Sequence, residues 1–91
     1  MTTYLAVAWL HDFPDDPVMI YSELDSDRRE TRKVEVFSDG SLSWADPSHE
    51  VRSGLSETEI PAITEIASDP QFAPREITAE EFEEVWSRAR T

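Results

Sequence analysis

The first half of the chain alternates between apolar and polar positions with the two-residue period of β-strands. Four such segments follow one another, over residues 4–11, 17–24, 30–37 and 42–45. The first is apolar at both parities, which is typical of a strand in the middle of a sheet. Asp39-Gly40 separates the last two segments, and this pair favours a hairpin turn because glycine readily adopts a positive φ. We therefore predict four antiparallel strands.

The second half of the chain carries helical patterns. Pro61 to Ser68 has isoleucines three residues apart, and the following Asp69-Pro70 would end a helix there. Thr78-Ala-Glu-Glu81 matches a capping box. It precedes an apolar stripe at helical spacing, formed by Phe82, Val85, Trp86 and Ala89. The predicted fold is a single α+β domain over residues 1–91, in the order ββββαα, with both C-terminal helices packed on one face of a four-stranded antiparallel sheet.

Alternation within the strands predicts which side chains share each face of the sheet. We expect the helices to cover the face that carries Val18, Ile20, Val34 and Val36. The opposite face would then carry Tyr21, Glu23, Asp25, Glu35 and Phe37. Aromatic residues among carboxylates favour a protein interface. The alternative is an ordinary solvated face with cross-strand ion pairs, such as Glu23 with Lys33.

Charge is the most unusual feature of the composition. The chain carries 20 carboxylates against 8 basic side chains, a formal net charge of −12. Such a field repels nucleic acids and anionic membranes and attracts cationic partners. We therefore expect no nucleic-acid binding. The acidity fits capture of a basic protein partner, although solubility or adaptation to high salt would also explain it.

Several classes of chemistry are excluded by what the sequence lacks. There is no cysteine, so disulfides, thiol catalysis and thiolate zinc sites are excluded. The sequence contains no P-loop, G-x-S-x-G or H-E-x-x-H motif. The longest uninterrupted apolar run, Tyr4 to Leu10, is far shorter than a membrane span, and no basic leader precedes it. We expect a cytoplasmic protein without cofactor or membrane contact; the sequence does not predict its oligomeric state.

The first hairpin collects the most suggestive polar residues. His11 stands where the first strand meets an acidic, proline-containing loop that includes Asp12 and Asp16. One interpretation is a general base or ligand-contacting imidazole assisted by these carboxylates. The other is a hydrogen-bonded histidine that orders the loop. The spacing of the aspartates does not match a calcium-binding loop, and we predict no metal site.

The same region resembles a known family. The chain contains a pattern formed by Trp9-x-His11, Pro17-Val18, Tyr21-Ser22-Glu23-Leu24-Asp25, Glu30-x-Arg32-Lys33-Val34-Glu35 and Phe37-x-Asp39-Gly40. In this it is similar to a family of small acidic bacterial proteins described as a domain of unknown function. Asp69-Pro70-x-Phe72 and the Phe82–Trp86 helix fit as well, whereas residues 45–59 match no pattern. The resemblance implies a shared fold and a shared surface site, but no activity.

The leading functional hypothesis is a non-enzymatic interaction module whose acidic surface engages a basic protein. Its most concrete form is an immunity or inhibitor protein that neutralises a toxin, such as a nuclease, by occupying the cationic site of that toxin. The alternative is a small enzyme or ligand-binding protein with a site at the first hairpin around His11. The predicted binding residues are His11, Asp12, Asp16, Tyr21, Glu23, Asp25, Glu35 and Phe37.

Overall fold

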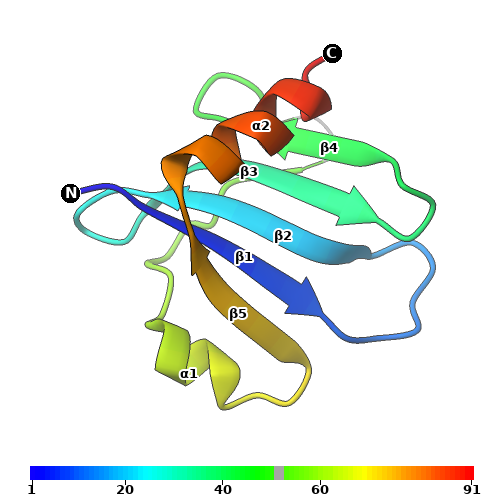
Figure 1. Cartoon of the computed structure of the whole chain (residues 1–91), viewed down its shortest axis with the longest axis horizontal. Coiled ribbons are helices and arrows are strands. Elements are labelled where there is room, and N and C mark those ends of the chain that lie inside the picture. Colours follow the sequence, from blue (N-terminus) through cyan, green and yellow to red (C-terminus); the bar gives the residue numbers. More distant parts are fainter. Residues whose placement is uncertain (51–52) are drawn as a thin grey trace.

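A five-stranded antiparallel sheet forms the centre of the computed structural model, which describes residues 1–50 and 53–91 (Figure 1). The strands are β1 (Thr3–Trp9), β2 (Pro17–Leu24), β3 (Glu30–Phe37), β4 (Leu42–Ala45) and β5 (Phe72–Ile77). Their order across the sheet is β4-β3-β2-β1-β5, so the first four strands form a meander and the last returns to pair with β1. The α+β class and the antiparallel sheet are confirmed.

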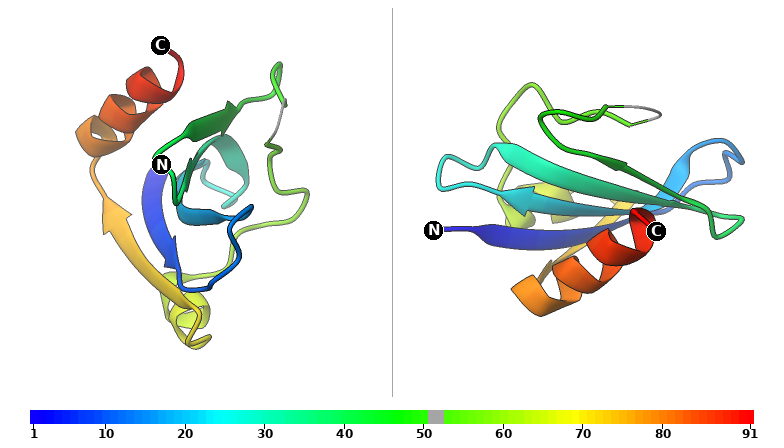
Figure 2. Two further views of the ribbon diagram at one scale, coloured as in Figure 1. Left: turned by 90° about the vertical axis from the view of Figure 1, so that its right-hand side faces the viewer. Right: turned by 90° about the horizontal axis from the view of Figure 1, so that it is seen from above.

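The described residues form two helices, α1 (Ile63–Ala67) and α2 (Ala79–Ala89). Helix α2 crosses one face of the sheet, and residues 53–62 cross the other (Figure 2). The predicted capping box begins α2: Thr78 Oγ1 accepts from the Glu81 N–H at 3.1 Å, and the Glu81 carboxylate accepts from the Thr78 N–H at 3.3 Å. Phe82, Val85 and Trp86 of the predicted stripe are buried against the sheet.

The predicted four-stranded sheet lacked the fifth strand. Strand β5 contains Pro74, which has no N–H to donate, and its neighbours Arg75 and Glu76 are polar. Proline is tolerated here because β5 is an edge strand with only β1 as its partner. The order of elements is therefore ββββαβα rather than ββββαα.

The predicted assignment of faces was wrong for β2: Val34 of β3 lies on the face that α2 covers, as expected, but Ile20 of β2 lies on the opposite face, where it lines a cavity. Tyr21 pairs with Val34 and Met19 pairs with Val36, so these side chains share the face that α2 covers. The register between β2 and β3 shifts by one residue between Glu23 and Leu24. A shift of one residue moves every following side chain of the partner strand to the opposite face.

The helices do not pack on the same face. Helix α2 contacts β1 to β4, whereas α1 packs against β5 and borders a cavity on the opposite face. That opposite face carries Leu5, Ile20, Ser22 and Leu24. Residues 53–62, here called the strap, run across it toward α1 (Figure 2).

Candidate functional site

The loop between β1 and β2, residues 10–16, is organised by His11. Its Nδ1 atom accepts from the Phe13 N–H at 2.9 Å, and its Nε2 atom lies 2.7 Å from the Pro17 carbonyl oxygen. Because Nδ1 is an acceptor, Nε2 carries the proton and donates to Pro17. A neutral imidazole has one donor and one acceptor, and both are used. This geometry suits a histidine that orders its loop and leaves no ring nitrogen for a general base.

Aromatic contacts fix the same loop. The His11 ring contacts Trp9 edge-on with 4.3 Å between ring centroids, and the Phe13 ring stacks on His11 at 5.4 Å. The Leu10 N–H donates to the Gln71 carbonyl at 2.7 Å, which ties the start of the loop to the entry of β5. The conformation of the loop is therefore defined before any partner binds.

This fixed loop exposes apolar side chains beside carboxylates. Leu10 is 59% exposed and Phe13 is 58% exposed, and they are the large apolar residues, apart from Met1, that lie most open in the described part of the chain. Asp12 and Asp15 are exposed beside them, and Asp16 is half-buried. The acidic residues of the loop were predicted from the sequence, but the exposure of Leu10 and Phe13 was not.

Two predicted site residues, Tyr21 and Glu23, lie beneath α2 rather than on an open face. Tyr21 packs against the core. The Glu23 carboxylate accepts a bidentate pair of hydrogen bonds from Arg32, with 2.8 Å between Oε1 and Nε and 2.5 Å between Oε2 and Nη2. Arg32 also reaches Glu83 on α2 at 2.6 Å. The hydrogen bonds from Arg32 hold the pKa of Glu23 below its ordinary value, although partial burial opposes this effect.

The other predicted site residues are scattered. Asp25 shapes the turn between β2 and β3, where its Oδ1 atom accepts from the N–H groups of Asp27 and Arg29, each at 2.9 Å. Glu35 and Phe37 alternate with Val34 and Val36 and therefore lie on the face opposite α2. Glu35 accepts from the Ser53 hydroxyl at 2.5 Å. The structure thus places His11, Asp12 and Asp16 in one loop, and Phe37 lies at the end of that loop as the sheet partner of Pro17. The other predicted residues lie elsewhere on the sheet: Tyr21, Glu23, Asp25 and Glu35.

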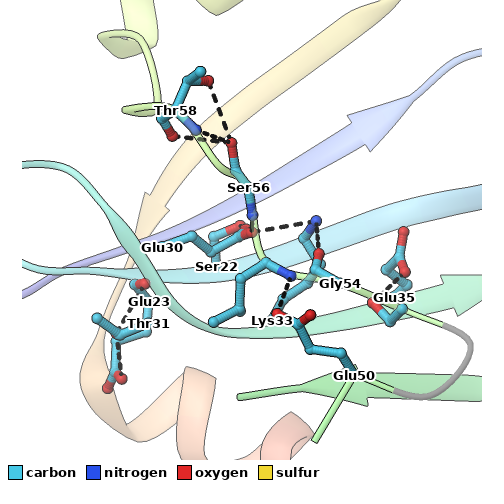
Figure 3. Close-up of polar contacts among 12 residues, drawn as sticks. Ser22, Glu23, Glu30, Thr31, Lys33, Glu35, Glu50, Gly54, Ser56 and Thr58 are labelled. Carbon is cyan, nitrogen blue, oxygen red and sulfur yellow. Dashed lines mark hydrogen bonds and ion pairs between the residues drawn. The ribbon is translucent and has the colours of Figure 1, made fainter. Parts of the chain in front are cut away.

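A buried carboxylate, Glu30, was missed at the sequence level. Its side chain is 1% exposed, and it accepts from the Ser22 hydroxyl at 2.6 Å and the Ser56 N–H at 2.8 Å (Figure 3). The Lys33 ammonium group lies 3.2 Å from Oε1 and also donates to the Gly54 carbonyl at 2.9 Å. The available indication was Ser22, a polar interruption on the apolar Ile20/Leu24 side of β2.

A cavity of about 470 Å³ opens beside Glu30 on this second face. The β-strands supply Leu5, Val7, Ile20 and Phe72, the strap supplies Ile60, and α1 supplies Ile66. Its polar end is formed by Ser22, Glu30, Lys33 and Ser56. The volume lies within the range of small-molecule sites, roughly 300–1,000 Å³.

Residues 1–50 and 53–91 contain no candidate metal-binding site. No group of three or more histidine or carboxylate side chains in these ranges is arranged to hold an ion. Asp12, Asp15 and Asp16 therefore do not form a metal-binding cluster. In the same ranges, no helix is long and apolar enough to cross a membrane.

Comparisons with other proteins identify the family and give no activity. Neither a curated protein nor a solved structure matches the chain. The family model described as "Domain of unknown function (DUF6881)" matches residues 3–91, which include every strand, both helices and the β1–β2 loop. The chain therefore belongs to the DUF6881 family.

Proposed function

We propose that this protein is a non-enzymatic binding module that engages a basic protein through the β1–β2 loop. The observation that carries the proposal is the pair of exposed apolar side chains, Leu10 and Phe13, set beside Asp12 and Asp15 on a loop that His11 holds in place. Aromatic anchors with a charged surround are typical of protein interfaces. Preorganisation of the loop lowers the entropic cost of association.

The charge distribution supports a cationic partner. The chain has a formal net charge of −12, and its basic side chains are largely occupied by internal contacts. Those that bond carboxylates or carbonyls, or lie over aromatic rings, are Arg28, Arg29, Arg32, Lys33, Arg75 and Arg90. Arg29 and Arg75 nevertheless remain more than half exposed, so the sign of the field follows from the excess of carboxylates over basic side chains. A field of this sign accelerates association with a positively charged surface.

The most specific form of the proposal is an immunity or inhibitor protein. Such a protein would block a toxin by covering the cationic surface with which that toxin contacts its own substrate. The acidic loop supplies the charge, and Phe13 supplies an anchor for an apolar pocket. The alternative, catalysis or ligand binding centred on His11, receives less support because both ring nitrogens are engaged by backbone groups.

The proposal is tested with the full chain as bait in an extract of the cells that encode it. A recovered protein is then purified, and its affinity for the chain is measured by calorimetry. We expect a basic protein that binds with one-to-one stoichiometry and with an association rate that falls as salt rises. Phe13→Ala should weaken binding by at least about tenfold if Phe13 is a central anchor.

A matched pair of charge variants separates the loop from the overall field. Asp12→Asn/Asp15→Asn and Glu57→Gln/Glu84→Gln each remove two of the 20 carboxylates, all four of which are exposed. We expect the first variant to lose affinity and the second to retain most of it. A partner that is acidic, or that tolerates all of the loop substitutions, would refute the proposal.

A further inference from the structure

The cavity on the second face is walled by three separate parts of the chain. Strands β1 and β2 provide an apolar floor with Val7 and Ile20, the strap closes one side with Ile60, and α1 closes another with Ile66. Most of its lining is therefore apolar. This arrangement suits the hydrocarbon part of a small molecule, because burial of apolar surface is favourable at about 25 cal/mol per Å².

The strap is held in place by polar contacts rather than by packing alone. Arg28 donates to the carbonyl oxygens of Ile60 and Pro61 at 2.8 and 2.7 Å, and the buried Glu30 carboxylate accepts from the Ser56 N–H. Figure 3 shows Lys33 extending toward the strap, where it bonds the Gly54 carbonyl. These contacts fix one wall of the cavity, so the cavity is a preformed feature of the fold.

The charges that line the cavity do not cancel. Glu30 is compensated by Lys33 at 3.2 Å. Two more carboxylates, Glu65 and Asp69, line the cavity and are exposed, so they lie at its rim. Within the described residues Glu65 makes no ion pair, and Asp69 uses one oxygen to accept from the Gln71 N–H at 2.9 Å. The charged side chains of the lining thus leave an excess of two carboxylates, which Arg28, bonded to the carbonyls of Ile60 and Pro61 in the wall, offsets in part.

We propose that this cavity binds a small organic amine, with the hydrocarbon body against the Val7/Ile20 floor and the protonated amino group near Glu65 and Asp69. A carboxylate or phosphate ligand is disfavoured by repulsion from the rim. The aromatic ring of Phe72, which also lines the cavity, adds a surface on which a cation is attracted. This site is separate from the β1–β2 loop and goes beyond the proposed function.

Three probes with the same hydrocarbon body test the proposal. 4-Phenylbutylamine, 4-phenylbutanol and 4-phenylbutyrate are titrated into the ¹⁵N-labelled full-length protein, and amide shifts are followed by NMR. We expect the amine to shift the amides of Leu5, Val7, Ile20 and Phe72 in a saturable manner. Its affinity should exceed that of the carboxylate by on the order of tenfold, with the alcohol between them.

Variants assign the charge preference to the rim. Glu65→Gln should lower the affinity for the amine by a few-fold and leave the affinity for the alcohol unchanged. Glu84→Gln makes the same charge change on α2, across the sheet from the cavity, and should leave both affinities unchanged. Both side chains are exposed, so neither substitution threatens the fold.

Three results would overturn the proposal: a carboxylate that binds as tightly as the amine, amide shifts confined to residues outside the cavity lining, or shifts that do not saturate. Failure here leaves the loop proposal unaffected, because affinity for the basic protein is measured separately with the Phe13 and Asp12/Asp15 variants.

Discussion

At the residue scale, Arg32 is the most heavily engaged side chain beneath α2. It contacts Glu23 on β2 and Glu83 on α2, and its guanidinium carbon lies 4.9 Å from the Phe82 ring centroid and 5.0 Å from the Trp86 ring. A planar guanidinium can bond carboxylates with its edge while its faces stack on aromatic rings. Arg32 therefore links the helix to the sheet by both charge and packing.

Replacing Arg32 with lysine keeps the charge and removes the planar fork. We expect Arg32→Lys to lower the free energy of unfolding by about 1–2 kcal/mol, because charge-assisted hydrogen bonds and ring stacking are lost. Arg29→Lys is the matched control, since Arg29 forms an exposed 3.6 Å pair with Glu59. Urea denaturation of both variants is the measurement. Equal losses for the two variants would contradict the role given to Arg32.

The lowered pKa of Glu23 also predicts a pH dependence. A carboxyl group with a lower pKa in the folded state stabilises the fold above its unfolded pKa, near 4.5, and this stabilisation is lost as the pH falls through the folded value. Glu23→Gln should therefore be less stable than the wild type at pH 7, and the difference should shrink below about pH 4.5. A difference that stays constant down to pH 3 in urea titrations would refute this linkage. Glu57→Gln, an exposed control, should show no such trend.

At the element scale, the sequence predicted most strands but not their relative facing. Residues 17–24, 30–37 and 42–45 agree with the observed strands, and the Thr78 capping box begins α2 as expected. These strands and the start of α2 are determined by residues close together in the sequence, through hydrophobic alternation and the capping box. The facing of β3 depends instead on a one-residue register shift at Glu23/Leu24, which no alternation pattern reveals.

Some residues of the candidate site could likewise be found from local sequence, and others could not. The acidic β1–β2 loop was found from its aspartates and prolines, and His11 from its place at the end of a strand. The Glu30 cluster was missed because it joins residues far apart in the sequence: Glu30 bonds Ser22 before it and Ser56 well after it. Only the tertiary fold brings these groups together.

The strap gives a test at this scale. Glu30→Ala removes the acceptor of the Ser56 N–H and leaves that donor without its partner. We expect a loss of about 1–3 kcal/mol in the free energy of unfolding, together with faster hydrogen exchange at the Ser56 amide. Glu57→Ala, on the same strap but exposed, should change neither quantity. Unchanged exchange at Ser56 in Glu30→Ala would show that Glu30 does not hold the strap.

At the scale of the whole molecule, self-repulsion is the dominant electrostatic feature. The principal extents are 31 × 31 × 24 Å, comparable to the Debye length of about 30 Å at 0.01 M salt and far above the roughly 8 Å at 0.15 M. At low salt, therefore, carboxylates on opposite sides of the molecule still repel one another. Added salt removes this repulsion more effectively than it weakens close pairs such as Arg32 with Glu23.

We expect the free energy of unfolding to rise between 0.01 and 0.15 M NaCl, measured by urea denaturation at pH 7. Glu57→Gln/Glu84→Gln, which removes two of the 20 carboxylates, should show a smaller rise than the wild type. A fall in stability over this range would mean that surface ion pairs outweigh the repulsion.

Binding of a basic protein by the β1–β2 loop can be measured with the matched charge variants. Calorimetry compares the affinity of the purified partner for Asp12→Asn/Asp15→Asn and for Glu57→Gln/Glu84→Gln, which have the same net charge. We expect an affinity loss of about tenfold or more in the loop variant and little change in the other. Equal affinities for the two variants would contradict it, because the loop would then contribute no more than any other acidic part of the surface.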